Sequence, residues 1–270
     1  MELSILIPTY NYDCQPLVDE LTRQAEKITD LQYEIIVLND KSTIPIHCTG
    51  CRQINMDYNV GRAKGRNILA SKAKYRYLLF IDSDSMPANG NYLSVYADMA
   101  CERCVLMGGR VYDDIYDRSH ALLPRYGQRE RNHGTHISKA PFVSPNFLID
   151  RDVFCGFNES LTGYGHEDTL FGIELHRQGT EYKCIDNPVI HRHIESNSEF
   201  LQKTKTSVEC LARLMDEYPE LGEVSTLLKW QRKVNLRVFR WTLPLLEKII
   251  VRCGSVKAMQ LWKLIYISGL

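Results

Sequence analysis

Short apolar runs alternate with helical patterns in the first half of the chain. The runs at residues 3–8 (LSILIP), 34–38 (EIIVL) and 77–81 (YLLFI) have the length and composition of buried β-strands. Between them, residues 16–28 and 61–73 have the apolar spacing of helices. Strands that alternate with helices in this way are typical of βαβ units. The pattern therefore predicts an α/β fold with a mainly parallel sheet and flanking helices.

The second half of the chain is less regular and ends in helices. Residues 105–112 and 142–149 have the pattern of strands, and residues 167–177 have the pattern of a helix. Residues 186–193 form an extended segment, and beyond Ser196 only helical patterns remain. We therefore expect the sheet to be complete before the last quarter of the chain.

Acidic residues follow two of the predicted strands. Asp40 lies in the polar turn after the strand at 34–38, and Asp82 and Asp84 follow the strand at 77–81. Ligands of open α/β sheets bind beyond the carboxyl ends of the strands, so these acids point to a single site. Two carboxylates spaced by one residue can bind a hard divalent cation directly or through water. An ordinary solvated turn is the alternative, since Asp and Ser also favour turns.

Two histidines, His191 and His193, lie in the extended segment near residue 190. Residues two apart in a strand face the same side, so one or both imidazoles could complete a metal site with the carboxylates. Imidazole ligands beside carboxylates favour manganese over magnesium. The alternative is a pair of partly exposed histidines that bind nothing.

Two adjacent acids, Glu167 and Asp168, open the predicted helix at 167–177. Acids at a helix N-terminus gain from the helix dipole, so capping alone is one interpretation. Capping does not explain Gly163 and Gly165 just before them, which leave room for a bulky acceptor. We expect Asp168 to deprotonate an acceptor hydroxyl and Glu167 to orient it.

Five segments, taken in chain order, resemble the family 2 glycosyltransferases with a GT-A fold. They are SILIPTYN (Ser4–Asn11), IIVLNDKS (Ile35–Ser42), NVGRAKGRN (Asn59–Asn67), LFIDSDSMP (Leu79–Pro87) and GYGHEDTLFG (Gly163–Gly172). The last segment is also similar to the acceptor-site segment of β-1,4-galactosyltransferases and chondroitin-type polymerases. In those enzymes a Trp occupies the place of Tyr164.

The resemblance implies a Rossmann-like GT-A catalytic domain over residues 1–195. Its nucleotide-sugar half would span about residues 1–112 and its acceptor half about residues 113–195, followed by a helical extension over residues 196–270. The implied reaction is an inverting transfer of a hexose or N-acetylhexosamine from a UDP-sugar to a glycan hydroxyl. The implied cofactor is Mn²⁺ or Mg²⁺.

The resemblance also implies a role for individual residues. Those expected at the nucleotide sugar are Pro8, Thr9, Tyr10, Asp40, Arg62, Arg66, Asp82 and Ser83. Among them, Asp40 would accept a hydrogen bond from uracil, and Arg62 or Arg66 would contact the diphosphate. Asp84 and His191 would bind the metal, with His193 as the reserve ligand. Asp168 matches the catalytic base, and the acceptor would contact Gly163, Tyr164, Gly165 and His166.

Two other functions share parts of this pattern. A strand followed by Asp-x-Asp also opens the haloacid-dehalogenase phosphatases, but those enzymes have Thr or Val where this chain has Met86. A sugar-nucleotide-binding protein without activity is the second alternative. Such a protein would more readily have lost Asp84, Asp168 or His191, and all three are present.

Charge is distributed unevenly along the chain. The 270 residues include 33 basic and 33 acidic side chains, a formal charge of zero. Residues 225–270 hold nine of the basic side chains and a single acid, Glu247, which gives this tail +8 and leaves −8 for the preceding residues. Net charge therefore decides nothing about nucleic acid, and it is the glycosyltransferase resemblance that argues against a nucleic-acid partner.

The basic tail also carries apolar residues at helical spacing, namely Val234, Val238, Trp241, Leu245 and Ile249. Basic amphipathic helices with Trp bind anionic membrane surfaces. Packing of the stripe on the catalytic domain or on a second subunit, as in a homodimer, is the alternative. An enzyme at the membrane would suit a glycolipid acceptor, as in surface polysaccharide synthesis.

Nine cysteines occur without a secretion signal before them or a membrane-spanning apolar run, which favours the reducing cytoplasm. We expect a peripheral enzyme at the inner face of the cell membrane. The pairs Cys48/Cys51 and Cys101/Cys104 are much farther apart than the two pairs of a zinc ribbon, so free thiols are the expectation.

Overall fold

The computed structural model describes residues 1–113, 116–133, 142–161 and 164–270. Contacts divide the chain into two compact units. The first comprises Met1–Val111, Thr135–Glu159 and Leu170–His193, and the second comprises Tyr112–Gly134, Ser160–Thr169 and Ile194–Leu270. Each unit has a hydrophobic core of its own.

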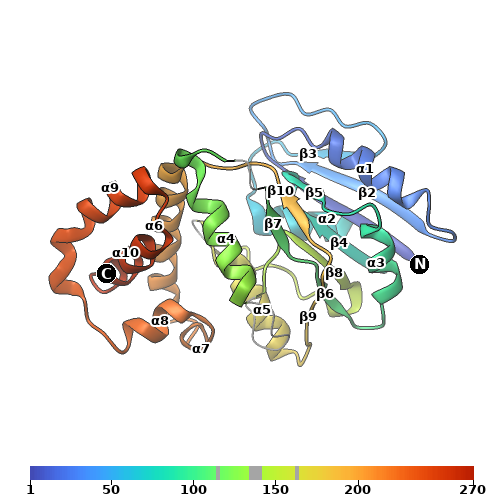
Figure 1. Cartoon of the computed structure of the whole chain (residues 1–270). Helices are drawn as coiled ribbons and strands as arrows, with labels where there is room; N and C mark the ends of the chain where they lie inside the picture. The colour runs from blue at the N-terminus through green and yellow to red at the C-terminus, as the bar shows by residue number, and fades with distance from the viewer. Residues whose placement is uncertain (114–115, 134–141, 162–163) are drawn as a thin grey trace. The chain divides into compact units, whose positions relative to one another are not determined.

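The first unit is built on a seven-stranded sheet with the strand order β3-β2-β1-β4-β8-β6-β9 (Figure 1). Its strands are β1 (Glu2–Thr9), β2 (Gln32–Asn39), β3 (Arg52–Asn55), β4 (Tyr77–Ile81), β6 (Val105–Met107), β8 (Asn146–Asp150) and β9 (Lys183–Cys184). Strands β1 to β4 are parallel, and β8 runs antiparallel between β4 and β6. The predicted mainly parallel sheet is confirmed.

A second, three-stranded sheet has the order β5-β10-β7 and consists of β5 (Ser85–Pro87), β7 (Arg110–Tyr112) and β10 (Val189–His191). The single strand predicted at 105–112 is therefore wrong, because β6 and β7 belong to different sheets. The first of the two strands ends before Gly108. A Cβ atom at that position would collide with the carbonyl oxygen of Asn187. The strand predicted at 142–149 is β8, which begins only at Asn146.

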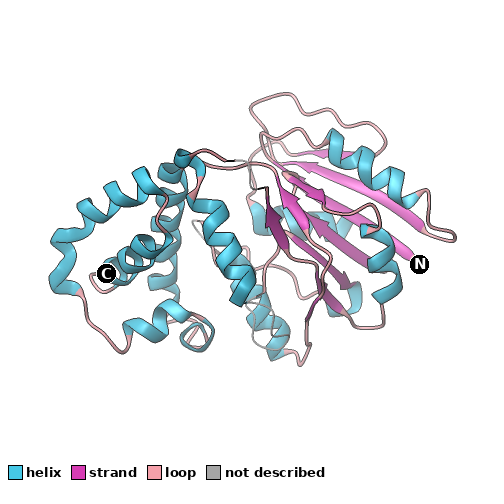
Figure 2. Cartoon of the chain, in the orientation of Figure 1, coloured by secondary structure: helices cyan, strands magenta, loops and turns pink. Residues whose placement is uncertain are grey.

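Helices cover both faces of the large sheet (Figures 1 and 2). The side chains of β1 alternate, so Ile5 and Ile7 pack with α1 (Gln15–Ala25) and α3 (Tyr92–Met99). Leu6 points the other way and packs with α2 (Arg62–Lys72) and with α5 (Glu167–Arg177) from Leu170 onward. A short 3-10 turn, η2 (Arg151–Val153), follows β8. The helix predicted at 16–28 ends three residues early, at Ala25.

The second unit consists mainly of helices (Figure 2). They are η1 (Arg118–His120), α4 (Leu122–His133), α6 (Asn197–Leu214), α7 (Leu221–Val224), α8 (Thr226–Gln231), η3 (Arg237–Thr242), α9 (Leu243–Cys253) and α10 (Val256–Ile267). Their core is formed by Leu122, Leu201, Ile250, Met259 and Trp262. The helices predicted beyond Ser196 are confirmed.

Asn197 holds the N-terminal end of α6 in this unit. Its buried amide accepts a hydrogen bond from the backbone N–H of Leu122 (2.8 Å) and donates to the carbonyl oxygens of Arg118 and Val251 (2.9 Å each). All of its side-chain bonds therefore go to backbone groups of η1, α4 and α9.

The apolar stripe of the tail is divided between two elements, in agreement with the expectation that Pro244 would kink or split its helix. Val234 precedes η3, Val238 and Trp241 lie in η3, and Leu245 and Ile249 lie in α9. Pro244 is tolerated because it occupies the first turn of α9, where its missing N–H leaves no helical bond unmade. None of the helices within the described ranges combines the length and apolar content needed to cross a bilayer.

Candidate active site

The loops after β1 and β2 are joined by the backbone N–H and the side chain of Asn11. Parallel pairing sets Thr9 opposite Asn39, so the two loops start side by side. Asn11 has a left-handed backbone (φ 54°), which Asn tolerates better than most residues. Its N–H donates to Oγ of Ser42 (2.8 Å), and its Oδ1 accepts from the N–H of Thr43 (2.6 Å). Together these bonds fix the edge of the sheet where the nucleotide is predicted to bind.

The predicted nucleotide residues of the first loop differ in exposure. Thr9 is buried and donates its hydroxyl to the carbonyl of Tyr12 (2.8 Å). Tyr10, the next residue, is 51% exposed, so its ring can reach a ligand. Pro8, the third predicted residue, is partly buried within β1. The geometry suits Thr9 to shaping the loop and Tyr10 to contacting the nucleotide.

Asp40 is largely occupied by the chain itself. Its Oδ1 accepts from the N–H of Val60 (2.6 Å) and its Oδ2 from the N–H of Gly61 (2.9 Å). These bonds tie the end of β2 to the start of α2, and they leave each carboxylate oxygen one further lone pair. Asp40 is therefore a structural anchor at this edge, and its contact with uracil stays a prediction.

The two arginines of α2 have different environments. Arg62 is exposed at the first residue of the helix. The Arg66 side chain is 4% exposed, and its Nη2 lies 2.7 Å from Oδ1 of Asp82. Nε and Nη1 of Arg66 are buried without a hydrogen-bond partner in the described part of the chain, and its guanidinium lies over the ring of Phe157. Arg66 thus places a positive charge, and two nitrogens that are unbonded within the described residues, next to Asp82. Ser83, the residue after Asp82, is also buried.

Asp84 and His191 are brought together by the small sheet. Antiparallel pairing of β5 with β10 sets Ser85 opposite His191, and the N–H of Arg192 donates to the carbonyl of Asp84 (2.7 Å). Nδ1 of His191 then lies 3.3 Å from Oδ1 of Asp84. His193, the reserve ligand, makes an edge-to-face contact with the ring of Tyr12 (6.3 Å). The predicted metal ligands are therefore neighbours in space although 107 positions separate them in the chain.

The charge of Asp84 is stabilised by its surroundings. Burial opposes ionisation, but contact with His191 and the nearby Arg110 and His193 outweigh it, so the pKa of Asp84 lies below its ordinary value. Burial and the charge of Asp84 also raise the pKa of the Tyr12 phenol. Sequence reasoning missed Tyr12 and Arg110, because neither belongs to a motif with a defined spacing to Asp84.

The donor set at Asp84 fits a divalent cation that is shared with a phosphate ligand. Oδ1 of Asp84 is buried and accepts no hydrogen bond from the described residues. No group of three or more His, Cys, Asp or Glu side chains in those residues is arranged to hold a metal. One carboxylate and one imidazole supply two ligands, and small divalent cations commonly complete their shell with water and substrate phosphates.

The predicted acceptor segment lies in the second unit, except for Gly163, which falls outside the described residues. Gly165 has φ +98°, and a Cβ there would lie 2.8 Å from Oγ of Ser207 on α6. Tyr164 lies beside Lys203, whose ammonium is 5.4 Å from the ring centroid. Glycine at 165 therefore meets a demand for close packing against α6, and the room that it would leave for an acceptor stays a prediction.

His166 and Asp168 both bond to nearby backbone. Nε2 of His166 lies 3.0 Å from the carbonyl oxygen of Ser207, and burial lowers the pKa of this imidazole. The predicted acceptor contact of His166 stays a prediction, while its observed role is to hold the loop on α6. Glu167 and Asp168 form the first turn of α5, and Oδ1 of Asp168 accepts from the N–H of Thr169 (2.8 Å).

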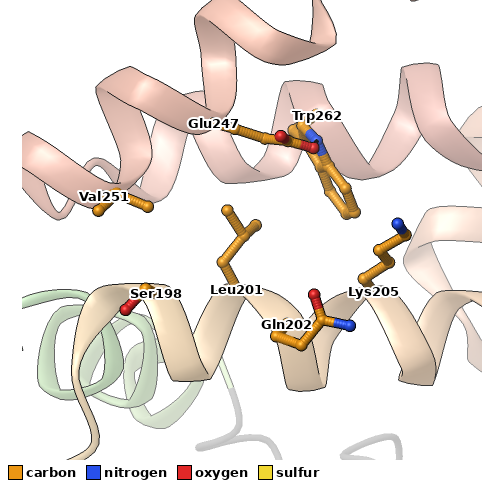
Figure 3. Close-up of a pocket in the computed structure, with 7 residues that line it drawn as sticks. All are labelled: Ser198, Leu201, Gln202, Lys205, Glu247, Val251 and Trp262. Carbon is orange, nitrogen blue, oxygen red and sulfur yellow. Dashed lines mark hydrogen bonds between the residues drawn. The ribbon is translucent and has the colours of Figure 1, made fainter.

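Two further features lie outside the predicted site. A pocket of about 200 Å³ is lined by residues of α6, α9 and α10 (Figure 3). All nine cysteines are free thiols, and the sulfur atoms of Cys14 and Cys48 are 3.2 Å apart. Burial and these neighbouring thiols raise the pKa of Cys14, so it is poorly reactive at neutral pH.

Comparisons of the sequence and of the structure with known proteins point to one family. Chondroitin synthase of Escherichia coli is 24% identical, over 70% of this chain and 34% of that protein. The chain thus spans about a third of that relative's length. The structure of TarS from S. aureus in complex with UDP has a TM-score of 0.54 at 18% identity, covering 93% of this chain and 81% of that one.

A mannosyltransferase from Pyrobaculum calidifontis, in complex with GDP-Man and Mn²⁺, has a TM-score of 0.59 at 14% identity, covering 98% of this chain and 84% of that one. At such identities the likeness concerns the fold, which is GT-A. Residues 4–157, more than half of the chain, match the profile of glycosyl transferase family 2. The segments that form the strand ends around Asp40 and Asp84 lie inside this match, and the chain belongs to glycosyl transferase family 2.

Proposed function

We propose that this glycosyltransferase is an inverting, metal-dependent enzyme that transfers a hexose or N-acetylhexosamine from a UDP-sugar to a glycan hydroxyl. The observation that carries the proposal is the 3.3 Å approach of Asp84 and His191 at the end of the buried strand β4. A carboxylate held ionised beside an imidazole is the donor set for a cation on a diphosphate.

The donor would bind along the carboxyl ends of β1, β2 and β4. The exposed ring of Tyr10 would stack on or border the base, with Asp40 accepting from uracil through a remaining lone pair. Arg62, which is exposed at the start of α2, would contact the diphosphate, while the buried Arg66 would keep Asp82 in place near the ribose. This division of labour between the two arginines follows from their exposure.

Asp84 and His191 would hold a divalent cation together with the donor phosphates. When bound, the cation supplies positive charge that stabilises the departing nucleoside diphosphate. The neighbouring Arg110 adds a fixed positive charge close to Asp84. Removal of the cation with EDTA is therefore expected to abolish UDP release, and manganese is expected to restore it.

Asp168 would act as the base. It would accept the proton of the acceptor hydroxyl as that oxygen attacks the anomeric carbon from the face opposite the leaving group. Glu167 would orient the acceptor by hydrogen bonds, and Tyr164 would stack on the acceptor sugar. An α-linked donor would then give a β-glycoside.

The acceptor would be a lipid-linked glycan of a surface polysaccharide, and the enzyme would work at the cytoplasmic face of the cell membrane. Two observations support this part of the proposal. One relative is named for the synthesis of a polysaccharide, chondroitin. The other is the charge of +8 in residues 225–270, which favours an anionic surface.

The first experiment is a screen of UDP-sugars with manganese, in which UDP release is measured with and without glycan acceptors. With the active donor, Asp168→Asn is expected to reduce transfer by about 10²–10⁴-fold and to leave donor affinity unchanged, because only proton transfer is lost. Glu181→Gln, an exposed acid of the first unit, is the matched control. Turnover retained by Asp168→Asn would remove that residue from the base role.

The same assays separate the alternatives. Family membership favours a transferase over a haloacid-dehalogenase phosphatase, and we expect no hydrolysis of a generic phosphate ester. A binding protein without activity would take up a UDP-sugar in calorimetry and release no UDP with any acceptor.

A further inference from the structure

The η3–α9 segment exposes more apolar surface than a solvated helix normally does. Val238 is 76% exposed, Trp241 78% and Leu245 60%, and Ile249 is also exposed. Large apolar side chains that stay this exposed on a folded protein are candidates for an interaction site. We refer to these four residues as the tail face.

The tail face is separate from the side of α9 that builds the core. Ile250 is fully buried against Leu122, Met259 and Trp262, with Leu246 packed beside it. Leu245 precedes Leu246, and Ile249 precedes Ile250. One position corresponds to about 100° of rotation around a helix, and both of these earlier residues remain exposed. Val238 and Trp241 are three residues apart in η3, the repeat of a 3-10 helix, so they share one side.

Charge around the tail face has one sign. Arg237, Lys248 and Arg252 are exposed on the same two elements. The one acid of the tail, Glu247, faces inward, where its Oε1 accepts a hydrogen bond from Nε1 of Trp262 (3.0 Å) at the pocket lined by residues of α6, α9 and α10 (Figure 3). The fold therefore turns the only acidic side chain of the tail away from the tail face and toward Trp262.

We propose that the tail face lies in the headgroup region of an anionic membrane, with Trp241 and Leu245 inserted and the flanking cations on lipid phosphates. An exposed Trp among cations is the composition of an interfacial segment, and charge complementarity selects an anionic bilayer over a protein surface of mixed charge. The inference deepens the proposed function, on which it rests for the acceptor, and names the surface that would bring the enzyme to a lipid-linked glycan.

The experiment is flotation of the full chain with vesicles of equal parts phosphatidylglycerol and phosphatidylcholine, and with phosphatidylcholine vesicles alone. Wild type is expected to float with the anionic vesicles and to stay behind with the neutral ones. The triple variant Val238→Ser/Trp241→Ser/Leu245→Ser is expected to lose at least about tenfold in partitioning, because it removes the inserted surface. Tyr58→Ser/Met99→Ser, exposed apolar residues of the first unit, is the control and is expected to float like wild type.

The charge component is tested by Arg237→Gln/Lys248→Gln/Arg252→Gln, which is expected to weaken flotation and to remove most of its dependence on salt. Circular dichroism and thermal melting confirm that the variants fold. Equal flotation of wild type and the triple apolar variant would overturn the proposal. So would a wild-type dimer that the triple variant converts to a monomer without any vesicle binding, since the tail face would then be a subunit contact.

UDP release with a water-soluble acceptor distinguishes this proposal from the proposed function. The triple variant is expected to keep that activity, because the tail face contains none of the residues assigned to chemistry. Wild type that floats but releases no UDP from any donor would contradict the proposed function and leave the membrane surface standing. The opposite result would contradict the membrane surface alone.

Discussion

The two tryptophans Trp241 and Trp262 show how differently the two sides of the C-terminal helices are used. Trp262 is fully buried, stacks on Tyr266 with a centroid distance of 4.7 Å, and has its N–H paired with Glu247. Trp241 lies only 21 positions earlier in the chain and is 78% exposed. The contrast separates a side that stabilises the fold from a side that is available to a partner.

The strand ends of the first unit that carry Asp40, Asp82 and Asp84, which we call the acidic edge, differ from both sides of the C-terminal helices. There the informative groups are buried charges that each have at least one fixed partner, such as Arg66 with Asp82 and Asp40 with two backbone N–H groups. Polar groups removed from water need such partners, so their positions are well defined before any ligand binds. The acidic edge is preorganised, whereas the tail face has exposed surface and no such network.

The largest expected effect is on catalysis at the acidic edge. Asp84→Asn is expected to lower the rate of UDP release by about a thousandfold, because it removes a charged ligand from beside the diphosphate. The measurement is turnover at saturating manganese and donor, with melting curves to confirm the fold. Asp57→Asn, an exposed acid of the same unit, is expected to behave like wild type. Equal activity of Asp84→Asn and wild type would show that Asp84 does not hold the cation.

The contrast between the two tryptophans is tested next. Trp262→Ala is expected to lower the free energy of unfolding of the helical unit by about 3–5 kcal/mol, because it empties a buried site. Trp241→Ala is expected to change it by less than about 0.5 kcal/mol, as for other exposed positions. Urea denaturation followed by circular dichroism measures both. A large loss of stability in Trp241→Ala would mean that this residue is part of the core.

The third expected effect is a loss of stability when the buried amide of Asn146 in the first unit is removed. Oδ1 of Asn146 accepts from the hydroxyls of Tyr92 (2.7 Å) and Tyr96 (2.8 Å), and its Nδ2 donates to the carbonyls of Gly109 and Asn187 (2.9 Å each). Asn146→Ala is expected to cost about 3 kcal/mol, because several buried groups lose a partner together. The control Asn89→Ala is exposed and should cost little. Comparable unfolding midpoints for the two variants would contradict the importance of this network.

The smallest expected effect is a dependence of stability on pH that is caused by His166. Burial lowers the pKa of the folded imidazole, so the unfolded chain takes up a proton first as the pH falls. The stabilisation is complete above the ordinary value of about 6.5 and is lost as the pH falls from there toward the folded pKa. His166→Asn, which suits the left-handed backbone at φ 71°, should flatten this part of the stability profile.

Urea denaturation of wild type and His166→Asn between pH 7 and pH 5 tests this expectation. His176→Asn removes an exposed histidine of α5 and should leave the profile as it is in wild type. A profile that is equally steep with and without His166 would assign the pH dependence to other groups.

The elements that sequence alone predicted well are those with a strong local signal. β4 and α5 have the predicted bounds, because a run of five apolar residues and a helix opened by two acids are each specified by their own residues. The three-residue strands β5, β7 and β10 carry no such signal. They exist because they pair with one another, and pairing is a property of the whole fold.

The candidate site divides in the same way. Motifs pointed to Asp84 and His191 separately, but their approach depends on the register of β5 with β10, which no local pattern encodes. Tyr12 and Arg110 were missed because they act on Asp84 only through space. The bond of His166 to Ser207 was missed for the same reason, since α6 lies 41 positions away in the chain.

The buried amide of Asn197 has a consequence for the order in which the chain can fold during synthesis. Its partners Arg118, Leu122 and Val251 lie 79, 75 and 54 positions away. Chains grow at about 5–20 residues per second, so the segment from Arg118 leaves the ribosome several seconds before Val251 does. The carbonyl of Arg118 and the N–H of Leu122 must wait for Asn197 on α6, and the buried amide of Asn197 must in turn wait for Val251 on α9. Truncation before Val251 would therefore leave this amide incompletely paired and the unit a target for chaperones and proteases.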